Sequence, residues 1–225
     1  MKFAEIMKHL KSVGTAQNVK VYKRHGAGVN VYGVSFAELT KLKKKIKTDQ
    51  ALAQQLWDTG NSDARCLAAM IADPEAFRAR LADAWLRDIS YPLLAEMLAG
   101  VVCRSPVALG RLKKWTHAKK ELARACGYSL LSNMLKHDPD SLTEEQCEAY
   151  LDTIEKEIHR SPNRARQTMN MAVIAIGIYK PKLRDRAIAA GRRIGHVEVD
   201  HGQTSCKTPE IEAYILKAAK RHKAC

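Results

Sequence analysis

The stretch Asn61-Ser62-Asp63-Ala64-Arg65-Cys66-Leu67 sets a pattern that the sequence repeats twice more, at Lys120-Glu121-Leu122-Ala123-Arg124-Ala125-Cys126 and at Pro162-Asn163-Arg164-Ala165-Arg166-Gln167-Thr168. Each stretch opens with polar or charged residues, reaches an Ala-Arg pair and continues into an apolar run with helical character. A fourth stretch, Tyr91-Pro92-Leu93-Leu94-Ala95-Glu96-Met97, lies between the first two and has alanine in the position of the arginine.

The spacing of these stretches indicates stacked helical repeats. Arg65 and Ala95 are 30 residues apart, Ala95 and Arg124 are 29 apart, and Arg124 and Arg166 are 42 apart. Similarity at such a period is typical of solenoids, because a single helical repeat cannot bury its apolar face alone. Neighbouring repeats then stack into a superhelix with a concave surface. We therefore expect an all-α solenoid whose recurring arginines line a basic concave groove.

Local patterns predict helices along almost the whole chain. Ser35-Phe36-Ala37-Glu38 and Thr143-Glu144-Glu145-Gln146 have the sequence of capping boxes, in which the first and fourth side chains satisfy free backbone N–H groups. The only alternating pattern is a short Val197–Val199 fragment in a loop at 195–207. Helices are expected at 2–13, 16–24, from Ser35 onward, and at 50–58, 62–72, 75–87, 90–103, 106–116, 119–135, 143–159, 162–178, 181–194 and 208–222.

The repeats favour one domain over the whole chain of 225 residues. Within it we expect N-terminal helices and a glycine-rich connection at 1–34, helical repeats at 35–194, and a loop with a terminal helix at 195–225.

The charge of the chain favours a polyanionic partner. Lys and Arg number 38 against 24 Asp and Glu, which gives a formal net charge of +14. Each Lys or Arg placed on a phosphate releases condensed counterions, so such an excess suits nucleic acid. The excess is uneven, with a net +7 over residues 1–60, +5 over 181–225 and −6 over 137–160. The acidic segment is expected to face away from the nucleic acid.

The cysteines and the N-terminus indicate a reduced, cytoplasmic protein. The six cysteines form no Cys-x-x-Cys pair, and the sequence has neither a signal peptide nor a long apolar run. We expect a monomer that needs no cofactor and does not contact membranes. Four potential zinc ligands crowd the late loop, but their spacing matches no standard zinc site, so a packed loop without metal is favoured. These residues are His196, Asp200, His201 and Cys206.

Several sequence markers, taken in order, resemble the AlkD-type DNA alkylation repair family of HEAT-like solenoids. The resemblance covers about residues 20–215. Its markers are Tyr32-Gly33-Val34, Gln55-Leu56-Trp57-Asp58, the spaced arginine helices, and the segment from Val197-Glu198-Val199-Asp200-His201-Gly202 to Cys206-Lys207-Thr208-Pro209.

The resemblance implies a protein related to glycosylases that remove alkylated purines from DNA. In that family two tryptophans flank the lesion and a carboxylate lies near the sugar, where it stabilises the oxocarbenium-like charge that develops as the glycosidic bond breaks. The family's Trp-x-x-x-Asp falls here on Tyr91 and Ala95, and its Trp-x-x-Arg falls on Met171 and Ile174. Only Arg124 keeps the residue type of the family.

Two other acids are candidates for the missing carboxylate. Glu96 is one position along the helix, which turns its side chain by about 100° from the inner face. Asp88 is expected in the turn that precedes Tyr91, from which it reaches inward if the turn is tight.

Two further features have open interpretations. Trp57 and Trp115 are interpreted as wedges between helices rather than as platforms for bases. The lysines from Lys41 to Lys47 almost surround one helix, so they form either a solvated face or a contact with the DNA backbone.

The leading hypothesis is a DNA-binding repeat protein that holds the phosphate backbone, reads DNA shape and excises no base. The alternatives are an active alkylpurine glycosylase of the 3-methyladenine or 7-methylguanine type, and a scaffold for protein interactions. The residues expected to contact DNA are Lys43, Lys44, Lys45, Arg65, Lys119, Lys120, Arg124, Arg164 and Arg166.

Overall fold

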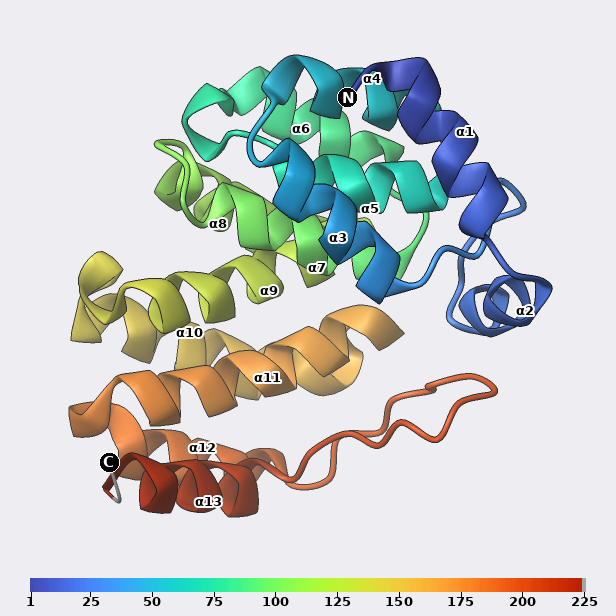
Figure 1. The fold of residues 1–225 in the computed structure, drawn as a ribbon. Coiled ribbons are helices and arrows are strands. Elements are labelled where there is room, and N and C mark those ends of the chain that lie inside the picture. Colours follow the sequence, from blue (N-terminus) through green and yellow to red (C-terminus); the bar gives the residue numbers. More distant parts are fainter. Residues whose placement is uncertain (224–225) are drawn as a thin grey trace. The chain divides into compact units, whose positions relative to one another are not determined.

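The computed structural model describes residues 1–223, and over that range the chain is helical with no strand (Figure 1). Cys225 lies outside the described residues. None of the helices described is both long and apolar enough to cross a lipid bilayer. The helices are α1 (Phe3–Val13), α2 (Ala16–Arg24), α3 (Phe36–Ile46), α4 (Gln50–Asp58), α5 (Ser62–Ile71), α6 (Ala79–Asp88), α7 (Pro92–Val102), α8 (Ala108–Thr116), α9 (Glu121–His137), α10 (Glu144–Glu157), α11 (Asn163–Tyr179), α12 (Arg184–Ile194) and α13 (Ile211–Lys223).

The chain packs as two compact units. Unit 1 comprises Met1–Val107 and Gly202–Thr204, and unit 2 comprises Ala108–His201 and the chain from Ser205 onward. In unit 1, α5 packs against α3, α4 and α7. In unit 2, α9 packs against α8 and α11, and α11 also packs against α12 and α13. The expectation of a single domain concerns how the two units are joined, and it stays a prediction.

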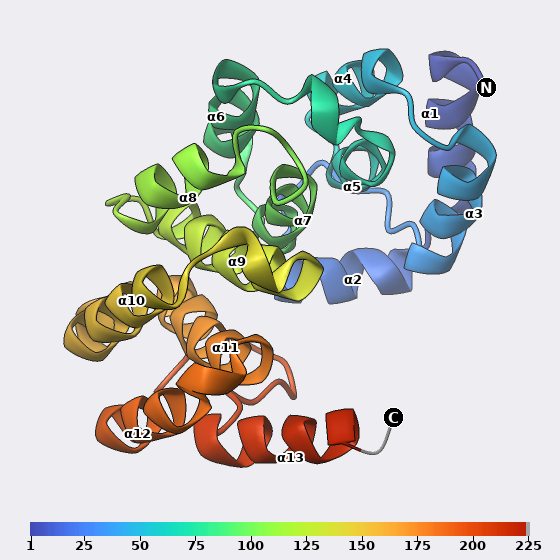
Figure 2. The ribbon, with the colours of Figure 1, turned by 90° about the vertical axis from the view of Figure 1, so that its left-hand side faces the viewer.

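Within each unit the helices form two rows (Figure 2). The outer row of unit 1 contains α4 and α6, and its inner row contains α5 and α7. The outer row of unit 2 contains α8, α10 and α12, and its inner row contains α9, α11 and α13. Paired outer and inner helices of this kind are the expected product of a helical repeat.

Polar side chains at the helix starts explain where the helices begin. Thr143 and Gln146 satisfy each other's backbone N–H groups at 3.2 and 2.9 Å, which confirms this capping box. The Ser35 hydroxyl accepts from the Glu38 backbone at 3.3 Å, as expected. Glu38 does not reach back to Ser35; its carboxylate pairs with Lys41 at 2.6 Å, so the second half of this box is wrong.

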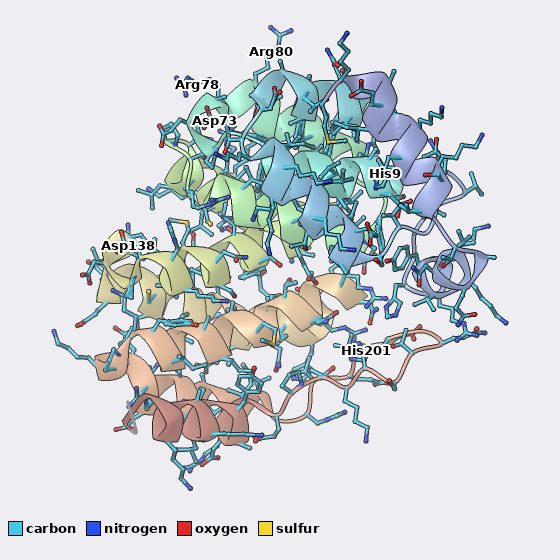
Figure 3. All side chains as sticks on the ribbon, viewed as in Figure 1. His9, Asp73, Arg78, Arg80, Asp138 and His201 are labelled. Carbon is cyan, nitrogen blue, oxygen red and sulfur yellow. The ribbon has the colours of Figure 1, made fainter. Side chains whose placement is uncertain are left out.

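The expected helix at 75–87 is shorter than predicted. A 3₁₀ turn at Pro74–Ala76 is capped by the Asp73 carboxylate, which accepts from the Glu75 backbone at 3.0 Å. Phe77 is then extended, with φ −72° and ψ 108°, and is fully buried. Its ring meets that of Trp85 edge to face, with centroids 5.0 Å apart. Burial of Phe77 therefore delays the start of α6; Asp73 and Arg78 mark this corner in Figure 3.

A buried carboxylate holds the N-terminal connection. Asp63, in the first turn of α5, accepts hydrogen bonds from three consecutive backbone N–H groups, those of Tyr32, Gly33 and Val34, at 2.6, 3.1 and 2.9 Å. Gly33 has φ +80°, and a Cβ there would lie 2.4 Å from the Thr15 carbonyl oxygen. The Tyr32-Gly33-Val34 marker is thus a loop shaped to bind Asp63.

A second glycine fixes the approach of α8 to α9. A Cβ added at Gly127 would lie 2.5 Å from the backbone nitrogen of Thr116. Glycine lets α9 lie directly against the end of α8. This contact also fixes the two ends of the loop between the helices, which carries Lys119 and Lys120.

Candidate nucleic-acid interface

Arg65 joins the ends of two outer helices in unit 1. Its Nε donates to the Trp57 carbonyl at 3.0 Å, at the end of α4. Its Nη1 donates to the Asp88 carbonyl at 2.9 Å, at the end of α6, and Nη2 lies 4.0 Å from the Asp88 carboxylate. The guanidinium also lies 5.2 Å from the centre of the Trp57 ring, a cation–π distance. Only 15% of the Arg65 side chain is exposed.

Arg124 makes the corresponding connection in unit 2. Its Nε donates to the Ala118 carbonyl at 2.9 Å, just after α8. Its Nη1 donates to the Ser161 hydroxyl at 3.3 Å and lies 3.5 Å from the Glu157 carboxylate at the end of α10. Both repeated arginines therefore brace consecutive outer helices from the start of the inner helix between them. Contact of either arginine with DNA remains a prediction.

The third repeated arginine differs from the first two. The Nε of Arg166 is buried and has no hydrogen-bond partner among the described residues. The neighbouring Arg164 donates from Nη1 to Gln167 at 3.4 Å, and its backbone N–H donates to the Glu121 carboxylate at 2.7 Å. A buried donor without an acceptor is costly, and because this nitrogen is out of contact with solvent it is not open to a phosphate either. Contact of Arg166 with DNA stays a prediction.

The predicted lysines are exposed in both units. Lys43, Lys44 and Lys45 occupy the last turn of α3 in unit 1. Lys119 and Lys120 precede α9 in unit 2 and are also exposed. None of the five forms an ion pair with a residue that the structure describes. Their ammonium groups are available to phosphate in a way that the braced arginines are not.

Tyr91 and Ala95, the positions that the resemblance matches to the family's first aromatic residue and its carboxylate, are closed to solvent. Tyr91 is 4% exposed and Ala95 is 2% exposed. Tyr91 lies against Tyr22, Asp63 and Cys66 around a cavity of only about 10 Å³, and burial raises the pKa of its hydroxyl. No carboxylate occupies position 95, and the aromatic ring before it is part of the core of unit 1.

The second matched pair lies in unit 2. Met171 is half-buried and Ile174 is 1% exposed, both on α11. Neither side chain carries a charge or an aromatic face. The tryptophan and arginine of the family thus have no chemical equivalents at these two positions.

The two candidate substitute acids have different surroundings. Asp88 accepts a hydrogen bond from the Trp57 indole N–H at 3.1 Å, so its carboxylate belongs to the Arg65 brace. Glu96 is exposed on α7, beside the buried Ala95. Neither is placed where the matched aspartate would be.

The tryptophans are packing residues, as the sequence indicated. Trp57 and Trp85 stack with their rings 3.9 Å apart and an interplanar angle of 7°, and both are almost fully buried. Trp115 is 1% exposed. Sequence reasoning missed Trp85, although Gln54-x-x-Trp57 and Trp85-x-x-Asp88 carry a usable signal. The indole N–H of Trp85 donates to the Gln54 side chain at 3.0 Å, and the indole N–H of Trp57 donates to the Asp88 carboxylate.

The late loop at 195–207 is held by hydrogen bonds to the start of α11 and to the segment that follows the loop. The Asn163 side chain bonds both the backbone N–H and the carbonyl of Asp200, each at 2.7 Å. A ring nitrogen of His201 shares a hydrogen bond with the Thr208 hydroxyl at 3.0 Å. Among the described residues, no three His, Cys, Asp or Glu side chains gather in a way that would hold a metal ion.

Comparison with known proteins identifies the family to which the chain is similar. The sequence profile described as "DNA alkylation repair enzyme" matches residues 6–213. Two curated relatives are similar over nearly their whole length: uncharacterized protein Lin0241 of Listeria innocua, 28% identical over 97% of this chain and 98% of its own, and uncharacterized protein Lmo0209 of Listeria monocytogenes, 27% identical over 98% and 99%.

A solved structure has the same fold. It is described as a new family of proteins related to the HEAT-like repeat DNA glycosylases with affinity for branched DNA structures. It superposes with a TM-score of 0.91 and 28% identity, over 99% of this chain and 95% of its own. The expected all-α, HEAT-like fold is confirmed.

Proposed function

Because the chain belongs to the DNA alkylation repair enzyme family, we propose that it binds DNA through the phosphate backbone and excises no base. One observation carries the second half of this proposal. The position matched to the family's carboxylate is Ala95, 2% exposed, next to a buried tyrosine. Removing one electrostatic stabiliser of a developing charge costs about a hundredfold or more in rate.

The similar solved structure supports a proposal for the form of DNA that this chain prefers. That protein has affinity for branched DNA structures, and its fold covers nearly all of this chain. We propose that this chain also prefers branched DNA over a plain duplex. Phosphate contacts suit such a target, because they read the path of the backbone rather than the edges of the bases.

Exposed basic side chains supply the contacts in this proposal. In unit 1 these are Lys43, Lys44 and Lys45, and in unit 2 they are Lys119 and Lys120, joined by the half-buried Arg164 and Arg166 at the start of α11. Their guanidinium groups would add charge-assisted donors to a phosphate at this end of α11. We propose that the protein acts as a monomer in this role.

The proposal is tested by binding and base release on the same preparation. A labelled four-way junction and a duplex of equal length are titrated with the full chain over roughly 50–250 mM salt. We expect tighter binding to the junction, and an affinity that falls steeply with salt, because each phosphate contact contributes about 0.9 to the slope. We expect no release of methylated purines from alkylated DNA above background.

A charge-matched pair of variants separates specific contacts from net charge. Lys43→Ala/Lys44→Ala/Lys45→Ala should weaken binding and reduce the salt slope by about two to three. Lys182→Ala/Lys217→Ala/Lys220→Ala removes three exposed positive charges from unit 2 and should change both much less. Salt-independent binding would overturn the phosphate contacts, and robust purine release would overturn the absence of catalysis.

A further inference from the structure

The loop between α2 and α3 presents a single apolar side chain to solvent (Figure 1). Val29, in the middle of this loop, is 92% exposed, the highest exposed fraction among the large hydrophobic residues that the structure describes. Single exposed apolar side chains are common on proteins, so the surroundings of Val29 decide whether it has a role.

Hydrogen bonds hold the loop on both sides of Val29. Before it, the Ala27 N–H donates at 2.9 Å to a carbonyl in the last turn of α2, and Ala27 is buried. After it, the Asn30 carbonyl accepts at 2.9 Å from the first backbone N–H of α5, and the Val31 N–H donates to the Val29 carbonyl at 3.1 Å. Only Gly28 and Val29 lie between these anchors. This two-residue tip is therefore held in place, with the apolar side chain of Val29 in solvent.

The tip lies at the starts of two inner helices of unit 1. The Asn30 side chain donates to the Thr59 carbonyl at 3.3 Å and accepts from the Asn61 side chain at 2.9 Å, directly before α5. A Cβ added at Gly26 would lie 3.3 Å from Cδ of Pro92, the first residue of α7. In unit 2, the basic residues that we propose to contact DNA likewise lie at the starts of inner helices, α9 and α11.

The segment that carries the tip is basic and free of acids. No Asp or Glu occurs between Glu5 and Glu38. Lys20, Lys23 and Arg24 on α2 are exposed, and none forms an ion pair with a residue that the structure describes. The hydrogen bond from the loop to the last turn of α2 keeps these charges beside the tip. A polyanion that reaches the tip thus meets an apolar side chain next to unpaired positive charges.

This combination suits DNA whose base stack is already interrupted. Proteins that kink DNA insert apolar side chains between base steps while Lys and Arg hold the neighbouring phosphates. Insertion into a plain duplex has to break stacking, whereas at a branch point part of that stacking is already lost. A wedge therefore favours branched DNA, which phosphate contacts common to both forms do not.

We propose that Val29 is a wedge that inserts between the bases at the branch point of DNA, while Lys20, Lys23 and Arg24 hold the adjacent phosphates. This inference rests on the proposed function and adds to it the residue that distinguishes branched DNA from a plain duplex.

Val29→Ala tests the wedge without removing a charge. The side chain is 92% exposed, so the thermal midpoint followed by circular dichroism should not change. Loss of apolar surface at the branch point should weaken binding to a four-way junction about tenfold and binding to a duplex of equal length less than about twofold. The salt slope should equal that of the wild type, because no phosphate contact is removed. Val29→Ile should keep junction binding, and Val29→Thr, which has the same shape with a hydroxyl group, should weaken it.

Two control variants separate the wedge from charge and from general apolar exposure. Lys20→Ala/Lys23→Ala/Arg24→Ala should weaken binding to both forms of DNA and lower the salt slope by about two to three. Leu109→Ala removes another exposed apolar side chain, which is 47% exposed at the rim of the open groove between α8 and α10 in unit 2. It should change neither affinity.

The fluorescent base 2-aminopurine, placed at the branch point, reports insertion directly. Its emission should rise when the wild type binds, because the base loses stacking, and should rise much less with saturating Val29→Ala. The same base in the middle of a duplex arm should not respond to either protein.

The outcomes separate the wedge from the proposed function. Junction affinity and 2-aminopurine emission that are unchanged in Val29→Ala overturn the wedge, while the proposed function stands. Equal losses for junction and duplex overturn it as the source of the preference. A wild type without preference for the junction overturns both. Binding to vesicles of phosphatidylserine and phosphatidylcholine that Val29→Ala abolishes, with junction binding intact, assigns the tip to a membrane surface instead.

Discussion

The outer helices α4 and α6 of unit 1 and α8 and α10 of unit 2 have the same connection and different interiors. In each pair, an arginine from the inner helix between them bonds a carbonyl at the end of the first helix and polar groups at the end of the second. Unit 1 then closes the space with stacked Trp57 and Trp85. Unit 2 leaves a cavity of about 280 Å³.

This difference teaches that the repeated arginines, Arg65 and Arg124, set the spacing between consecutive outer helices. Other side chains, such as Trp57 and Trp85, decide whether the space between those helices is filled. The carbonyl and carboxylate partners of Arg65 and Arg124 are at helix ends, so the brace fixes distance without filling volume. A recurring arginine in a repeat protein is therefore not by itself evidence of a ligand.

Removing an indole from the filled pair should have the largest effect. Trp85→Ala deletes a side chain that is 1% exposed and stacked on Trp57, so we expect a loss of about 3–5 kcal/mol in the free energy of unfolding. Urea denaturation measures this. Leu109→Ala, at the rim of the open groove and 47% exposed, is the matched change in unit 2 and should cost less than about 1 kcal/mol. Similar losses in both would mean that the two pairs are equally packed.

The closed interior of unit 1 also decides what a restored catalytic site would cost. Ala95→Asp places a carboxylate at a position that is 2% exposed, and Tyr91→Trp enlarges a ring that is 4% exposed. An unpaired polar group in the core costs about 1–3 kcal/mol, and overpacking costs a similar amount. We expect the double variant to lose stability and to release no methylated purine. Measurable release would show that position 95 faces DNA.

The two braces should be worth similar amounts. Arg65→Ala and Arg124→Ala each leave partly buried acceptors without a donor, so we expect losses of about 1–3 kcal/mol by urea denaturation. Lysine in either position should not restore stability, because it lacks the Nε and Nη donors in their fixed geometry. Junction binding at several salt concentrations separates this role from a DNA contact. A fall of about one in the salt slope for Arg124→Ala would show that it also holds a phosphate.

Most of the fold could be predicted because its determinants are local. Helical periodicity, the Thr143 capping box and the Asp49 and Asn61 caps lie within a few residues of what they control. The start of α6 was predicted wrongly, because the burial of Phe77 against Trp85 depends on a contact across the turn.

The site was less predictable, because its partners are distant in the sequence. Arg65 bonds a carbonyl 23 residues away, and Arg124 approaches a carboxylate 33 residues away. The repeated Ala-Arg pairs predict where these arginines lie on their helices, but they do not predict which groups the arginines bond. The burial of Tyr91 depends likewise on α2 and α5, which no local pattern connects to it.

The smallest expected effect concerns the thiol beneath Tyr91. Burial, with a smaller contribution from Asp63, raises the pKa of Cys66 from 9.0 to about 12. Between these values the unfolded chain releases a proton that the folded chain keeps, so stability falls as pH rises, by up to about 1.4 kcal/mol per pH unit. Well below pH 9 the thiol is protonated in both states and contributes no slope.

Cys66→Ala should therefore flatten the decline in the free energy of unfolding between pH 9 and pH 10, measured by urea denaturation, whereas Cys206→Ala, at an exposed position of unit 2, should leave it unchanged. Iodoacetamide at pH 8 should modify Cys206 well before Cys66, because the thiolate is the reactive form and Cys66 is 4% exposed. An unchanged slope in Cys66→Ala, or rapid alkylation of Cys66, would show that solvent enters the interior of unit 1. The contrast between a filled unit 1 and an open groove in unit 2 would then no longer hold.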